Sequence, residues 1–289
     1  MRFFASWKEN GLFKLKITGS TPVECVSIFM QISKFKPYTN GIRHRTSIKK
    51  NLLSKVNNLL KQTIVGFRRF KGRSSETGRI TTRHLGGGCK KKFRVLEFSD
   101  TKKQSIVISI MYDPYRSSFI SLNFNFVSNV FFRTIATAGV GSGSLQECNK
   151  KKVDLKLGNR TSLEHVPPGS VLHSLSLNSK IKYVRSAGTY FQIVQKDLNV
   201  CKVRLPSGLI KVTSSTSFGT MGIVSNSQHS STYLGKAGQS RLLGIRPSVR
   251  GIAMNPVDHP HGGRTNGGRP SVTPWGIPTK GQPTVIRKK

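Results

Sequence analysis

Apolar and turn-forming residues alternate in short blocks between about residues 79 and 135. The apolar blocks are rich in Ile, Val and Phe, and glycine, Ser-Asp and Asp-Pro steps separate them. Blocks of this kind predict β-strands. The expected strands are Arg79–Leu85, Phe93–Phe98, Gln104–Tyr112, Ser118–Phe126 and Val130–Ile135. Short strands this close together favour a small barrel, for which an OB-like closure is an economical solution.

A second β-rich block follows Gly139–Gly143, which has the composition of a linker. Its expected strands are Ser170–Leu177, Tyr183–Arg185, Tyr190–Gln195, Val200–Leu205 and Leu209–Val212. Pro206-Ser207-Gly208 supplies a tight turn between the last two. The pattern predicts a second small barrel.

The sequence before the first barrel has helical spacing instead. Ile48, Leu52, Val56 and Leu59 recur at intervals that place them on one face of a helix from about Ser47 to Thr63. We interpret residues 1–71 as a variable, partly helical N-terminal extension, and a targeting role for it stays open.

From about Met221 onward the periodicity fades. This last stretch of 69 residues holds 11 of the 28 glycines and 7 of the 13 prolines. Such a segment cannot form a core of its own and would stay unfolded in isolation. It is expected to be an extended arm that orders on a partner.

The charge indicates what that partner is. The 289 residues include 48 Lys and Arg but 11 Asp and Glu, a formal net charge of +37. A compact monomer with this charge would repel itself unless it bound a polyanion. The basic residues are spread along the whole chain rather than gathered on one amphipathic helix, which favours nucleic acid over an anionic membrane or an acidic protein. No apolar run is long enough to predict a membrane-spanning helix.

The cysteines give no sign of a cofactor. Cys25, Cys89, Cys148 and Cys201 form no C-x-x-C pair, so reduced thiols in an intracellular compartment are expected rather than a disulfide framework or a zinc site. We expect no cofactor.

Two motifs carry candidate chemistry. Gly78–Lys92 joins glycines that allow close backbone approach to lysines that attract phosphate; a nucleotide pocket is disfavoured because G-x-x-x-x-G-K-[ST] is absent. In Asn255–Gly263, the residues Asp258, His259 and His261 could serve a metal-dependent hydrolase, but a catalytic zinc site needs three ligands on a rigid frame. A polar turn whose imidazoles hydrogen-bond RNA or backbone is favoured.

Several segments together closely resemble the family of universal ribosomal protein 2 of the large subunit. They occur in the family's order from about Gly72 to Lys289, some three-quarters of the chain. The segments are Gly78–Lys92, Tyr112–Ser117, Val184–Thr189, Arg204–Gly208, Leu234–Gly238, Gly244–Gly251, Met254–Gly263 and Pro270–Gly276.

This resemblance implies a mainly β fold with an OB-fold barrel, an SH3-like barrel and a long C-terminal extension. The expected domains are 1–71, the N-terminal extension; 72–143, the OB-fold-like domain; 144–220, the SH3-like barrel; and 221–289, the arm. It also implies a non-enzymatic protein that binds large-subunit rRNA, supports subunit association and organises RNA near the peptidyl-transferase centre. The family's histidine of the Asp-His-Pro-His segment falls on His259, as an rRNA-positioning contact. The extension before residue 72 receives no role from the resemblance.

We expect rRNA contacts from arginines, lysines, histidines and glycines of these segments. They are Arg79, Arg83, Gly86, Gly87, Gly88, Lys90, Lys91, Lys92, Arg241, Arg246, Arg250, His259, His261, Gly262, Gly263 and Arg264.

The expected partners are rRNA and neighbouring ribosomal proteins, with the small subunit at an intersubunit bridge left open; no membrane and no homo-oligomer are expected. The C-terminal sequence favours a mitochondrial ribosome, and a plastid or bacterial origin stays open. Besides the hydrolase, the alternative is a diffusible single-stranded RNA-binding protein.

Overall fold

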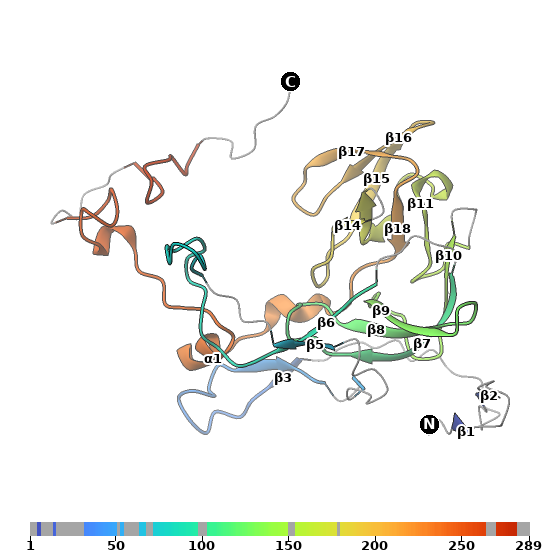
Figure 1. Ribbon diagram of the computed structural model, residues 1–289, viewed down its shortest axis with the longest axis horizontal. Helices are drawn as coiled ribbons and strands as arrows, with labels where there is room; N and C mark the ends of the chain where they lie inside the picture. Colours follow the sequence, from blue (N-terminus) through green and yellow to red (C-terminus); the bar gives the residue numbers. More distant parts are fainter. Residues whose placement is uncertain are drawn as a thin grey trace. The chain divides into compact units, whose positions relative to one another are not determined.

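The computed structural model is mainly β, as predicted (Figure 1). It describes residues 5–6, 14–15, 32–50, 53–54, 64–67, 72–97, 103–149, 154–177, 180–263 and 270–281. By its internal contacts the chain divides into two compact units. The first unit comprises Met1–Phe67 and Lys91–Gly235, and the second comprises Arg68–Lys90 and Lys236–Lys289. The four-part division expected from the sequence stays a prediction.

A ten-stranded sheet dominates the first unit, in the order β17-β16-β15-β12-β18-β11-β10-β7-β8-β9. Its neighbouring strands are antiparallel except for the parallel pair β10 and β11. The strands are β7 (Lys103–Met111), β8 (Ile120–Asn125), β9 (Val130–Ile135), β10 (Leu145–Asn149), β11 (Arg160–Ser162), β12 (Val171–His173), β15 (Phe191–Lys196), β16 (Val200–Arg204), β17 (Ile210–Ser214) and β18 (Phe218–Met221).

The two ends of this sheet cover separate apolar cores. Around β7, β8 and β9, the buried side chains include Met111, Ile120 and Leu122. Around β12, β15 and β16 they include Leu172 and Phe191. These three-strand groups can be followed as β7–β8–β9 and β15–β16–β17 in Figure 1. The alternating apolar positions of the sequence therefore do build two strand-rich regions, each with its own core.

Four smaller pairs complete the strands of the described residues. They are β1 (Ala5–Ser6) with β2 (Lys14–Leu15), β3 (Ile32–Lys34) with β4 (Thr46–Ile48), β5 (Ile64–Phe67) with β6 (Lys92–Arg94), and β13 (Leu175–Leu177) with β14 (Lys180–Tyr183).

The expected strand Arg79–Leu85 does not form. In this segment only Ile80 and Leu85 make isolated bridges, to Arg73 and Ile245. His84 has a φ of 58°, which lies outside the extended region and turns the chain away from a neighbouring strand. Ser174 has the same effect in the expected strand Ser170–Leu177, because its φ of 53° separates β12 from β13.

The Gly139–Gly143 segment does more than link two domains. Val140 is buried with Val107 and Phe119, and the Gly143 amide donates to the Val107 carbonyl. β10, β11 and β18 were not expected, and they make the sheet continuous across both strand-rich regions.

The expected helix from Ser47 to Thr63 is wrong where the structure describes it. Ser47 and Ile48 belong to strand β4, and the Ser54 amide donates to the Ile110 carbonyl. Ile48 and Leu53 pack against the core under β7 instead of forming one helical face. Most of the remaining positions of that helix, Leu52, Val56 and Leu59 among them, lie outside the described residues.

The irregular character expected from Met221 begins a little later. Val224 is fully buried with Met111 and Ile135, so the chain just past β18 still belongs to the first unit. A 3₁₀ turn, η3 (Ser227–Ser231), follows, and the second unit then carries the one-and-a-half-turn helix α1 (Ala237–Leu242) and η4 (Gly251–Ala253). A further 3₁₀ turn in the first unit, η2, spans Leu163–His165.

Candidate nucleic-acid interface

The second unit concentrates positive charge on a small amount of chain. Its two segments hold 17 Lys and Arg residues against two acidic residues, Glu76 and Asp258. The predicted contact residues Arg79, Arg83, Lys90, Arg241, Arg246 and Arg250 all lie in this unit, and each is exposed. Exposed arginines on one small unit can bind several phosphates, and each contact would release counterions.

A tight loop presents the first of these arginines. Gly72 is buried, and a Cβ there would lie 2.5 Å from the Thr82 carbonyl oxygen. The Thr81 and Thr82 amides both donate to the Gly72 carbonyl. Because the backbone closes on itself at this glycine, Arg79 and Arg83 are held at the outside of a compact turn.

The glycine-rich loop is joined to a segment far along the chain. The Gly86 amide donates to the Gly244 carbonyl (2.9 Å), the Cys89 amide to the Leu242 carbonyl (3.0 Å) and the Arg246 amide to the His84 carbonyl (2.9 Å). The Gly78–Lys92 and Gly244–Gly251 segments, which the sequence does not relate, are thus joined by backbone hydrogen bonds. This pairing brings Arg246 beside Gly86, whose Cβ would lie 3.2 Å from the arginine Nε.

The three glycines of this loop have different surroundings. A Cβ on Gly88 would lie 2.8 Å from the Gly244 nitrogen, so this glycine is needed for the contact within the protein. Gly87 has a φ of 70° and nothing within 4 Å of its Cβ position. The open side of the loop is therefore at Gly87, where a phosphate could approach the backbone.

The expected lysine cluster is divided between the two units. Lys90 is exposed in the second unit, whereas Lys91 and Lys92 belong to the first. Lys92 is exposed on β6, and Lys91 is partly buried, its carbonyl accepting a hydrogen bond from the Tyr115 hydroxyl. The backbone of this cluster is thus anchored to the first unit.

The Asn255–Gly263 segment is a closed turn. The Gly262 amide donates to the His259 carbonyl (2.8 Å), and the His259 amide to the Asn255 carbonyl. A Cβ on Gly262 would lie 2.2 Å from the Asn255 oxygen, so only glycine fits there. Gly263 (φ 116°) is exposed and its amide donates to the Met254 carbonyl.

His259 is the buried histidine of this turn. Its imidazole lies over Gly251, where a Cβ would come within 2.8 Å of the ring nitrogens. The His261 amide donates to His259 Nδ1 (3.0 Å), which leaves the proton of the neutral ring on Nε2. Desolvation lowers the pKa of His259, and the nearby positive charges of His261 and Arg83 lower it further. The neutral ring is therefore favoured.

These contacts bear on the hydrolase alternative. Nδ1 of His259 already accepts a hydrogen bond, and Nε2 of His261 lies 2.8 Å from the Pro270 carbonyl oxygen. Over the part of the chain that the structure describes, no three His, Cys, Asp or Glu side chains gather as a metal site would require. The two imidazoles organise backbone instead.

Trp275, near the last described residues, is 70% exposed. The Arg83 guanidinium lies 5.6 Å from the Trp275 ring centre, and Val272 and Pro278 form a bridge that closes the intervening turn. The remaining predicted contact, Arg264, lies outside the described residues.

The sequence analysis missed a buried ionic cluster in the first unit. The Asp113 carboxylate is completely buried, with Arg116 Nε at 2.9 Å and Arg94 Nη1 at 3.7 Å. It also accepts the Tyr115 amide. The Asp-Pro step within a resemblance segment thus anchors β6 to the loop after β7. The signal for this cluster in the sequence was the presence of an acidic residue, Asp113, in a strongly basic chain.

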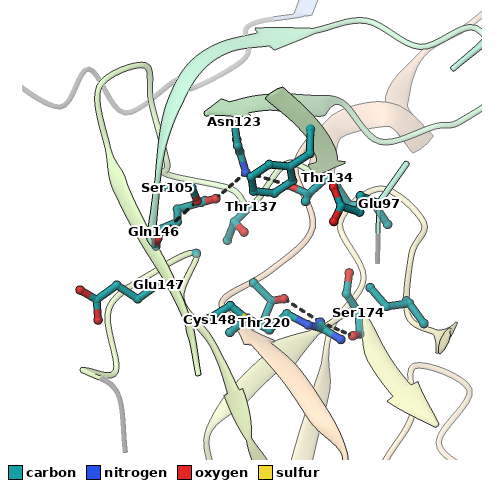
Figure 2. A pocket seen from close by; sticks show the side chains of 15 residues that line it. Glu97, Ser105, Asn123, Thr134, Thr137, Gln146, Glu147, Cys148, Ser174 and Thr220 are labelled. Carbon is teal, nitrogen blue, oxygen red and sulfur yellow. Dashed lines mark hydrogen bonds between the residues drawn. The ribbon is translucent and has the colours of Figure 1, made fainter. Parts of the chain in front are cut away.

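A small polar cavity lies where the two regions of the sheet meet. It has a volume of about 70 Å³, room for water rather than for a nucleotide. Figure 2 shows the Asn123 side-chain amide donating to Thr134 and Gln146 on one side of the cavity. On the other side, the Ser174 carbonyl and the Thr220 hydroxyl accept hydrogen bonds from Arg160. We interpret the cavity as a polar gap between the two regions of the sheet, and not as a ligand site.

No helix within the described ranges has the length and apolar character needed to cross a membrane.

Comparison with known proteins connects this basic surface to a family. Residues 60–148 match the family model described as Ribosomal Proteins L2, RNA binding N-terminal domain, and residues 156–276 match Ribosomal Proteins L2, C-terminal domain.

Full-length relatives match as well. The chain is 42% identical over 268 residues to "Large ribosomal subunit protein uL2m" of Reclinomonas americana, covering 90% of this chain and 95% of the relative. It is 42% identical over 266 residues to "Large ribosomal subunit protein uL2" of Wolbachia pipientis wMel, with 90% and 96% covered. It is 44% identical over 266 residues to the protein of the same name from the wPip strain, again with 90% and 96% covered. The similarity reaches further than the three-quarters of the chain in which the resembling segments lie.

Proposed function

The chain belongs to the ribosomal protein L2 family, and on this premise we propose that it is a structural protein of a large ribosomal subunit that binds large-subunit rRNA. The observation that carries the proposal is the charge of the second unit. This unit has 17 basic and two acidic residues, and its described arginines include exposed ones. Counterion release from such a surface favours RNA over any less charged partner.

The two units contribute differently to this function. The first unit is a rigid β platform with apolar cores. The second supplies arginine side chains and a loop whose backbone is open at Gly87. We propose that Lys236–Lys289, most of the expected arm 221–289, penetrate between RNA helices and that Arg68–Lys90 also contact RNA, whereas the rest of the expected domains 72–143 and 144–220 forms the platform.

His259 has a positioning role in this proposal. It fixes the turn that carries His261 and Gly263, and its neutral ring would donate from Nε2. The protein itself then performs no chemistry: the RNA carries the reaction of the peptidyl-transferase centre, and the chain supports its shape and the association of subunits. The small subunit is the further partner in an intersubunit bridge.

We place the protein in a mitochondrial ribosome. The relatives include a mitochondrial uL2m and bacterial uL2 proteins at similar identity. The choice between them rests on the Gly267–Gly281 segment of the sequence. A bacterial or plastid ribosome is the alternative.

Sedimentation of a lysate from the source cells tests the proposed function. We expect the protein in the large-subunit fractions, released only by high salt. Arg246→Lys should reduce its incorporation although charge is kept, because only arginine bonds a phosphate in a bidentate way. A dominant free pool outside ribosomal fractions would overturn the proposal and favour a diffusible RNA-binding protein.

A further inference from the structure

The β3–β4 hairpin carries a dense group of basic and aromatic residues. Between Cys25 and Ser75 the sequence has no Asp or Glu. Within the hairpin, Lys34, Lys36, Arg43, His44 and Arg45 accompany Phe35 and Tyr38. The hairpin precedes residue 60, where the RNA-binding family model begins, and none of the rRNA contacts expected from the sequence lies in it.

A distant segment fixes this hairpin in place. The Thr46 amide donates to the Tyr233 carbonyl (3.1 Å), the Thr46 hydroxyl donates to the Ser231 carbonyl (3.0 Å), and the Tyr233 amide donates to the same hydroxyl (2.8 Å). A Cβ on Gly235 would lie 2.7 Å from the Gly41 carbonyl oxygen, so the two backbones are in close contact. Both segments belong to the first unit.

The docked segments line an open hollow of about 470 Å³, within the usual size range of small-ligand pockets. Phe35 and Tyr233 line it together with Arg43, His44 and Arg45. The Arg45 guanidinium lies 4.7 Å from the centre of the Phe35 ring, which holds both groups in a stack.

The aromatic side chains are not used to hold the segments together. Tyr233 is 66% exposed, and Phe35 is 38% exposed. The docking bonds of Tyr233 come from its backbone. An exposed aromatic ring on a fixed backbone, surrounded by cations, suits a planar anionic ligand.

We propose that this hollow binds an unpaired nucleotide of single-stranded RNA, with the base stacked on Tyr233 beside the Phe35–Arg45 stack and the phosphate bonded by Arg43. The inference rests on the proposed ribosomal function and adds a contact site to it. An unpaired nucleotide is favoured over a duplex because bases inside an A-form helix cannot stack on side chains. It is favoured over an acidic peptide because a carboxylate, unlike a nucleobase, does not stack on an aromatic ring.

Photocrosslinking of the full-length protein tests the site. The probe is a short oligouridylate containing 4-thiouridine, and the readout is the yield of crosslinked peptide containing Phe35. We expect a crosslink in the unaltered protein, a yield about tenfold lower in Tyr233→Ala, as expected for the loss of a stacked base, and near-normal yield in Tyr233→Trp. Arg43→Gln should lower the yield in a salt-dependent manner.

The matched control is Phe126→Ala, which removes a partly exposed aromatic ring (47%) at the residue after β8 and should leave the Phe35 crosslink unchanged. The inference is wrong if the Phe35 peptide does not crosslink, if Tyr233→Ala leaves its yield unchanged, or if oligoglutamate competes better than unlabelled oligouridylate. Such a failure would leave sedimentation of the protein with large subunits intact, whereas loss of that sedimentation would overturn the proposed function itself.

Discussion

At the scale of single residues, Asp113 is a completely buried carboxylate in a strongly basic chain. Its carboxylate has no solvent exposure and pairs with Arg116 at 2.9 Å, so removing the charge would leave a largely buried guanidinium without compensation. Asp113→Asn should lower the free energy of unfolding by about 3–5 kcal/mol. Urea denaturation of the full-length protein, followed by tyrosine fluorescence of the first unit, measures it.

Asp154→Asn is the matched control for this substitution. Asp154 pairs with Lys156 at 3.1 Å, but both side chains are about three-quarters exposed. Exposed pairs contribute about 0–1 kcal/mol. Equal effects of the two substitutions would show that the Asp113 cluster contributes no more than a surface pair.

The residue scale also shows why the candidate site was only partly predictable. Arginine charge is visible in a sequence, and it predicted Arg79, Arg83, Arg241, Arg246 and Arg250 as rRNA contacts. The structure leaves these side chains exposed, and the contacts themselves stay a prediction. By contrast, the sequence does not show which residue Gly88 contacts. Its contact with Gly244 joins residues that no local pattern relates, and a glycine is compatible with close protein packing as well as with phosphate approach.

At the scale of elements, His173 links the two regions of the sheet. It lies on β12, its Nε2 is 2.8 Å from the Thr137 hydroxyl, and its Nδ1 is 2.8 Å from the Ser174 hydroxyl. Complete burial, with the positive charge of Arg160, lowers its pKa to about 3.

This burial predicts a pH dependence of stability. The unfolded chain binds a proton at His173 near pH 6.5, whereas the folded chain does not until about pH 3. The unfolded state therefore binds more protons between these values, and stability should fall as the pH is lowered through that window, by up to about 1.4 kcal/mol per pH unit. Urea midpoints measured from pH 7 to pH 4 check it, and His173→Gln should flatten the profile. An equally steep profile in the variant would assign the effect to other groups.

Elements with a clear two-residue period were the predictable ones. The expected strand Val130–Ile135 coincides with β9, and Val200–Leu205 differs from β16 by one residue. β11 is only Arg160–Ser162, too short and too polar for a pattern. Arg79–Leu85 shows the opposite error: its residues alternate as in a strand, but its backbone hydrogen bonds go to Gly72 and to the Gly244–Arg246 segment.

At the scale of the whole molecule, apolar burial is unequal. The three apolar core clusters found among the described residues all lie in the first unit. In the second unit, Leu242, Ile245, Val249, Ile252 and Trp275 are each at least 44% exposed. Hydrogen bonds between turns contribute little net stability without burial, so we expect folded RNA to supply further contacts.

Limited trypsin digestion tests this division of stability. In free protein, cleavage should begin after Arg241 and Arg250, because local opening of a segment without a core is frequent. The buried Arg133 on β9 provides the internal control and should be cut far more slowly. Binding to large-subunit rRNA should protect the two arm sites and leave the Arg133 rate nearly unchanged. Slow cleavage of the arm in protein freed of all polynucleotide would mean that the second unit is stable alone, and that RNA is not what holds its structure.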